Sequence, residues 1–158
     1  MPRSFARIIS VKARQEATAL LHRCLGTDAN LPPCDGRSII LGLQGYQLGT
    51  IAVATATVLP DGTGSLANAA VHPEFQGRGI GTDLVEARVN WLRSMGVTKA
   101  IVSEAWASRH GVNAAKPLVR NGFQLVRINE KGFAWCKDCP ACRPNACECD
   151  AWIYELRK

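Results

Sequence analysis

The most informative segment of the chain reads Gln76-Gly77-Arg78-Gly79-Ile80-Gly81. It follows small and apolar residues at 65–71, which predict a β-strand, and it opens a helix predicted over residues 79–95. A glycine-rich turn at a helix start exposes unpaired backbone N–H groups at the positive end of the helix dipole. A diphosphate can approach such a backbone closely because no side chain stands in its way. The segment therefore predicts a phosphate-binding turn, which we call the glycine turn (residues 76–82).

Two familiar phosphate loops fit this segment less well. A Walker loop ends in Gly-Lys-Ser/Thr, whereas Gly79 is followed by Ile80-Gly81-Thr82. A dinucleotide-binding turn has three glycines in the order G-x-G-x-x-G, and the glycines here are spaced differently.

The other predicted elements alternate around the glycine turn. Ser10 caps a helix that ends at Gly26, and Pro60-Asp61-Gly62 marks a turn. The remaining predicted elements are a hairpin over 38–43 and 48–59, strands over 99–106, 123–128 and 151–156, and a short helix over 113–121. This order predicts an α/β fold with helices on both faces of one mixed sheet.

The residues around the glycine turn carry a family resemblance. Ala69-Ala70-Val71-His72-Pro73-Glu74-Phe75 with the glycine turn closely resembles the acetyl-coenzyme A (acetyl-CoA) segment of the GNAT superfamily, V-x-P-x-x-(Q/R)-x-x-G-x-(G/A). Asn121-Gly122-Phe123 is similar to the Gly-Phe that opens a later strand of that family. The resemblance covers about residues 38–128 and the last strand. It implies a mainly antiparallel sheet with a V-shaped splay between two central parallel strands.

The resemblance also implies where acetyl-CoA binds. The cofactor is expected between the strands at 65–71 and 99–106, with backbone groups of Ala70 and Val71 on its pantetheine arm. Asn113 is expected to contact the pantetheine arm or a nearby water. The remaining cofactor-binding residues are those of the glycine turn, namely Gln76, Gly77, Arg78, Gly79, Ile80, Gly81 and Thr82.

The reaction implied is direct attack of an amine on the thioester, which needs proximity, an oxyanion donor and proton transfer. Glu104 is the candidate base, because residues 104–108 resemble the Glu-x-x-Ala-Ser stretch of ribosomal-protein alanine N-acetyltransferases. Leu118 stands where the family often has a tyrosine acid. Three alternatives follow: water protonates the thiolate, another group such as Tyr46 or Ser108 does so, or the chain binds CoA without efficient turnover.

Five of the seven cysteines fall between residues 136 and 149. Without a secretion signal, this crowding favours a metal over disulfides. The spacing predicts a structural zinc site that holds an acceptor loop, with Cys136 as a spare or alternative ligand. The predicted ligands are Cys139, Cys142, Cys147 and Cys149. The alternatives are an iron–sulfur cluster on the C-x-x-C-x-x-C run, reduced free thiols and a redox-active cysteine pair.

Composition bounds the remaining possibilities. The 158 residues suit one domain, 1–158, with the cysteine-rich insertion at about 136–149. The net charge of +6 suits phosphates and leaves nucleic acid open as a partner. The sequence shows no signal peptide and no long apolar run, so the protein is expected to be cytoplasmic and not to bind a membrane. A homodimer is an open possibility. The alternative function is a degenerate acyltransferase fold that binds nucleic acid or a protein through a zinc knuckle.

Overall fold

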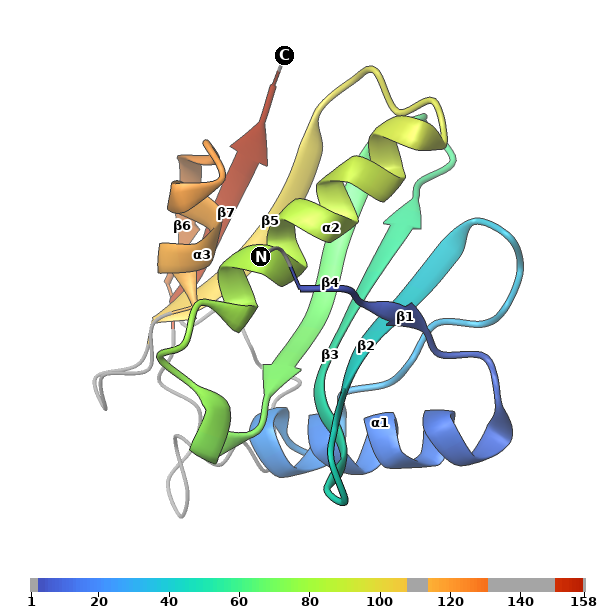
Figure 1. The fold of residues 1–158 in the computed structure, drawn as a ribbon. Coiled ribbons are helices and arrows are strands. Elements are labelled where there is room, and N and C mark those ends of the chain that lie inside the picture. Colours follow the sequence, from blue (N-terminus) through green and yellow to red (C-terminus); the bar gives the residue numbers. More distant parts are fainter. Residues whose placement is uncertain (1–2, 108–113, 131–149, 158) are drawn as a thin grey trace.

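The computed structural model describes residues 3–107, 114–130 and 150–157. These residues form a seven-stranded sheet in the order β1-β2-β3-β4-β5-β7-β6 (Figure 1). The strands are β1 (Ala6–Arg7), β2 (Ser38–Gly45), β3 (Gly49–Val58), β4 (Gly64–Val71), β5 (Ile101–Ala107), β6 (Gln124–Asn129) and β7 (Asp150–Leu156). The helices are α1 (Val11–Leu25), the 3-10 turn η1 (Pro73–Phe75), α2 (Ile80–Ser94) and α3 (Ala115–Arg120).

Helices cover both faces of the sheet. Successive residues of β2 alternate between two cores, with Ile39 and Leu41 in one and Ile40 in the other. The larger core lies beneath α2 and α3, and the smaller one lies beneath α1. Because side chains of a strand alternate between faces, this sorting places α1 opposite α2 and α3. The predicted helices on both faces are confirmed.

A β-bulge interrupts the pairing of β3 with β4. The ladder skips Thr55 of β3 and two residues of β4 opposite it, Ala67 and Asn68. Because β4 has one extra residue at the bulge, its later side chains lie on the opposite face of the sheet from the one that simple alternation would give. Leu66 accordingly lies in the α2 core and Ala70 in the α1 core, although four residues separate them.

The splay between the central strands begins at this bulge. β4 and β5 are parallel and pair over three positions only, ending at Leu66 with Ser103. Both strands continue beyond that point, β4 to Val71 and β5 to Ala107, without further pairing to each other. β5 then pairs with β7 instead. The predicted V-shaped opening is therefore confirmed, and the bend at residues 67–68 is its local cause.

The predicted element boundaries hold to within about two residues. Ser10 caps α1 by accepting a hydrogen bond from the Ala13 N–H at 3.2 Å, and Gly26 follows its last residue. Met95, the C-cap residue that follows α2, is 46% exposed, so it does not extend the apolar stripe of the helix. In the described residues, none of the helices is both long and apolar enough to span a bilayer.

Candidate functional site

The splay opens into a cavity of about 1000 Å³, which we call the central cavity. Its walls come from the diverging halves of β4 and β5, the start of α2 and one side of α3. The end of α1 and the following loop close it on the opposite face of the sheet, through Cys24, Leu25 and Ala29. The cavity therefore runs from the glycine turn to the α1 face.

The glycine turn has the backbone geometry that the sequence predicts. Gly77 and Gly79 have φ of 74° and 80°, a region that L side chains rarely adopt. The hydrogen-bond ladder of α2 begins with the Asp83 N–H donating to the Gly79 carbonyl at 3.1 Å. The three preceding N–H groups, those of residues 80–82, consequently have no intrahelical acceptor. They lie at the cavity wall and suit an anion.

Side chains of the turn hold its shape. Gln76 donates from Nε2 to the Val71 carbonyl at 2.9 Å and so ties the turn to the end of β4. Arg78 donates to the Glu74 carbonyl at 3.0 Å, and its guanidinium lies 5.0 Å from the centre of the Phe75 ring. Gln76 also lines the cavity, whereas Arg78 does not. Of the predicted turn residues, Arg78 is thus the one that the structure places outside the cavity wall.

Arg3, near the start of the chain, contacts the glycine turn and the first turn of α2. The sequence alone does not indicate these contacts. Its guanidinium donates to the Arg78 carbonyl at 2.7 Å and pairs with the Asp83 carboxylate in the first turn of α2. Asp83 would otherwise place a negative charge beside the free N–H groups. Arg3 therefore neutralises the acidic group next to this anion site.

Glu104 lies in the splayed half of β5 and lines the central cavity. It is in register with Ile153 of β7, which in turn faces Arg127 of β6, so the three side chains share one face. Its neighbours Ser103 and Ala105 are buried on the α2 side, which places Glu104 on the α1 face. Within the described ranges, no ion pair or hydrogen bond occupies its carboxylate.

The structure narrows the candidates for proton donor. Leu118 is buried and lines the cavity at the position where a tyrosine is usual. Tyr46 is 90% exposed in the turn between β2 and β3 and does not line the cavity, so it is excluded as a substitute in this conformation. Ser108 lies outside the described residues, as does Asn113.

The predicted zinc ligands, Cys139, Cys142, Cys147 and Cys149, and the spare Cys136 also lie outside the described residues. Across ranges 3–107, 114–130 and 150–157, no three His, Cys, Asp or Glu side chains cluster as metal ligands do. Cys24 also lines the central cavity, and burial raises the pKa of its thiol.

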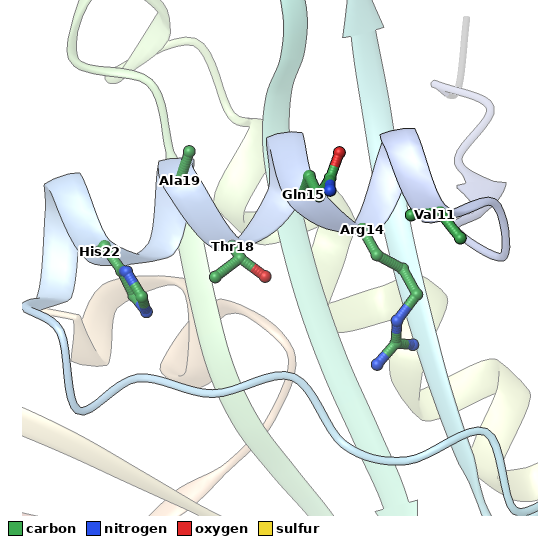
Figure 2. A pocket seen from close by; sticks show the side chains of 6 residues that line it. All are labelled: Val11, Arg14, Gln15, Thr18, Ala19 and His22. Atoms are coloured by element: carbon green, nitrogen blue, oxygen red, sulfur yellow. The ribbon is translucent and has the colours of Figure 1, made fainter.

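A second, open depression of about 450 Å³ follows α1 (Figure 2). Its lining side chains all come from α1 and none of them lines the central cavity. Arg14 crosses from it to the next loop and donates to the Pro32 carbonyl at 3.0 Å. This arrangement fixes the loop against α1 and brings no reactive cluster together.

Comparison with known proteins decides the family. Residues 13–123 match the model of the Acetyltransferase (GNAT) family. The chain belongs to the GNAT family of acetyltransferases. A GNAT enzyme of this kind is an N-acetyltransferase that uses acetyl-CoA. No curated protein sequence matches the chain significantly.

Solved structures share the GNAT fold at low sequence identity. The ribosomal-protein-S18-alanine N-acetyltransferase from Escherichia coli aligns with a TM-score of 0.67 at 20% identity, over 97% of this chain and 92% of that one. The NatC complex bound to Gag peptide and CoA gives a TM-score of 0.71 at 15% identity, over 100% and 99%. A putative streptothricin acetyltransferase from Bacillus anthracis in complex with acetyl-CoA gives 0.57 at 13%, over 83% and 66%.

Cys24 provides a test of cavity occupancy. Saturating CoA is expected to slow alkylation of Cys24 at least about tenfold, because the thiol lines the cavity and would be covered. Cys34 is exposed, lies outside the cavity and should react at an unchanged rate. Peptide mass mapping after timed iodoacetamide treatment measures both rates in one sample. Equal protection of the two cysteines, or of neither, would contradict the placement.

Arg3→Ala is expected to weaken CoA binding by roughly three- to tenfold with little change in the melting temperature, because the released Asp83 carboxylate would repel the diphosphate. Adding Asp83→Asn to this variant should restore most of the affinity. Arg7→Ala, another basic residue of the same segment, is the matched control. Equilibrium dialysis at fixed ionic strength measures all four proteins. An unrestored double variant would show that Arg3 does not act through Asp83.

Proposed function

We propose that this GNAT enzyme transfers the acetyl group of acetyl-CoA to a primary amine, with Glu104 as the general base. The observation that supports this most is the continuity of the central cavity. One wall carries the free N–H groups of the glycine turn, and another carries the Glu104 carboxylate on the α1 face. A thioester cofactor and an amine entering from opposite ends would meet between them.

The cofactor is proposed to lie along the free edge of β4. After Leu66, β4 has lost its β5 neighbour, so backbone groups along the splayed segment that ends at Ala70 and Val71 can pair with the amides of pantetheine. The diphosphate would then reach the N–H groups of residues 80–82, and the adjacent Gly77 and Gly79 leave room for it. Asn113 is proposed as a further contact, as the family resemblance implies.

The proposed chemistry needs no covalent enzyme intermediate. The ammonium form of the acceptor gives a proton to Glu104, directly or through one water, and the free amine attacks the thioester carbonyl carbon. A C–N bond forms, the C–S bond breaks, and the amine nitrogen gives its second proton to solvent water. Glu104 then releases the first proton to solvent. The departing sulfur takes up a proton from water, because the tyrosine position is filled by Leu118.

The acceptor is proposed only as a primary amine. Of the proteins with this fold, one acetylates an alanine of a ribosomal protein and another is a putative streptothricin acetyltransferase, so the shared fold does not select an acceptor. The test is a panel of peptides with free α-amines, lysine peptides and polyamines, assayed for CoA release and for an acetylated product. Each active amine should lose all activity when its nitrogen is blocked. CoA release without any acetylated amine would oppose the proposal.

The cysteine segment is proposed to hold one structural zinc ion through Cys139, Cys142, Cys147 and Cys149, on the strength of their spacing alone. Elemental analysis of purified protein is expected to give about one zinc per chain and no iron. Cys142→Ser should lower this content, whereas Cys34→Ser, outside the segment, should not. Iron with a visible absorbance band would support the cluster alternative, and metal-free protein would oppose both.

A further inference from the structure

Arg88 of α2 is a cation buried inside the protein at the wall of the central cavity. Its side chain belongs to a residue that is only 3% exposed, and it follows Ile80 and Leu84 on the buried stripe of the helix. In the part of the chain that the structure describes, no carboxylate forms an ion pair with it. Burial lowers the pKa of Arg88 to about 10, so it remains charged at neutral pH.

The guanidinium is bound to backbone carbonyls, two of which belong to the β-bulge. Nη1 donates to the Thr55 carbonyl at 3.2 Å and to the Ala67 carbonyl at 3.1 Å. Nε donates to the Leu84 carbonyl of its own helix at 3.1 Å, which fixes the side chain. Thr55 and Ala67 are residues that the β3–β4 ladder skips. Arg88 therefore bridges the two strands where they do not pair with each other.

This arrangement is a costly way to stabilise a core. A buried charge without a counter-ion carries a desolvation cost, and an apolar side chain of similar length is often no worse for stability. What the guanidinium supplies is geometry, because its planar fork can hold carbonyls of two strands and of the helix at once. An apolar side chain would leave the Thr55 and Ala67 carbonyls without this donor and the two strands without this link.

We propose that Arg88 is a positioning residue for acetyl transfer: it holds the β4 bulge in the bent form that keeps β4 apart from β5. The inference rests on the assignment of acetyl-CoA to the central cavity. The bulge lies directly after the last β4–β5 pair, at Leu66 and Ser103, so its shape sets where the splay begins. Arg88 thereby positions the β4 edge on which the pantetheine arm is expected to lie.

The experiment compares Arg88→Met and Arg88→Lys with wild type by CoA equilibrium dialysis, steady-state kinetics and thermal unfolding. Arg88→Met is expected to lose about tenfold to a hundredfold in CoA affinity, with the KM for acetyl-CoA raised in parallel. Arg88→Lys should fall between, because an ammonium keeps the charge but cannot reproduce the fork. The KM for the amine should change by less than about threefold, since β5 keeps its pairing with β7.

Two controls separate positioning from stability. Arg93→Met removes another α2 arginine that donates to two carbonyls, those of Val97 and Lys99, away from the cavity. Val97→Ala makes a small hole in the same core outside the cavity lining and lowers the melting temperature without touching the bulge. Both should bind CoA as wild type does.

Several outcomes overturn the inference. One is wild-type CoA affinity in Arg88→Met. Another is a loss of CoA affinity in Arg88→Met that is no larger than the loss in Val97→Ala, when each variant is measured the same number of degrees below its own melting temperature. If Arg88→Met does not fold, Arg88→Lys decides alone, and wild-type affinity in it would refute the positioning role. A wild-type protein that binds no CoA would instead refute the assignment of the cavity.

Discussion

Replacing Gly79 by valine is expected to weaken CoA binding at least about a hundredfold, because two or more hydrogen bonds from the glycine turn to a charged diphosphate would be lost. The φ of Gly79 is 80°, which a β-branched residue strongly disfavours. A Cβ atom on residue 79 would contact Arg3 Nη1, at 3.8 Å, and would otherwise project into open space. The side chain would thus occupy the path of the diphosphate rather than collide with the core. Calorimetric titration with CoA measures the loss.

Gly96→Val is the matched control for this variant. Gly96 follows the other end of the same helix, has φ of 86° and has open space around its missing side chain. Both substitutions carry a similar conformational cost, about 1–2 kcal/mol or more, but only one stands at the cavity. CoA affinity should therefore survive in Gly96→Val. Equal losses in the two variants would assign the effect to backbone strain instead of to the phosphate site.

Glu104→Gln is expected to lower kcat about a hundredfold to ten-thousandfold while CoA affinity stays within about threefold of wild type. Glutamine keeps the shape and hydrogen-bonding reach of the side chain but cannot take a proton from the amine. Raising the pH should recover part of the rate, because more of the acceptor then arrives already deprotonated. Stopped-time assays of CoA release at several pH values measure both effects.

Glu155→Gln serves as the control for charge on the same face. Glu155 of β7 is in register with Val102, one strand from Glu104, and its carboxylate is bound by Arg157. It does not line the central cavity. Near-normal turnover in this variant, with loss in Glu104→Gln, would assign the base function to Glu104. A Glu104→Gln enzyme with full kcat would remove it from the mechanism.

The features that sequence predicts well here are those that local chemistry determines. The glycine turn needs positive φ at Gly77 and Gly79, and glycine alone adopts it readily, so the pattern marks the site. The first long helix is marked by the Ser10 side chain and by Gly26 at its end. Glu104 could be placed on a cleft strand because its neighbours resemble a known stretch.

The features that sequence does not predict arise from contacts between distant segments. Residues 65–71 are mostly small, so no alternation of large apolar side chains reveals that the bulge at 67–68 reverses the two faces. The burial of Arg88 does have a sequence signal, because Arg88 occupies the next position of the buried stripe after Ile80 and Leu84, where an apolar residue is expected. The contact of Arg3 with the glycine turn has no sequence signal, because 75 positions separate Arg3 from Arg78 in the chain.

The N–H groups of residues 80–82 are proposed to bind the diphosphate of a cofactor that lies in the splay between β4 and β5. An amide NMR titration of ¹⁵N-labelled protein with CoA tests this directly. The largest shifts are predicted at those three amides and at Ala70 and Val71, with Gly96 unmoved. If saturating CoA leaves residues 80–82 unchanged while other regions shift, or if no amide responds, the cofactor does not bind where this account places it.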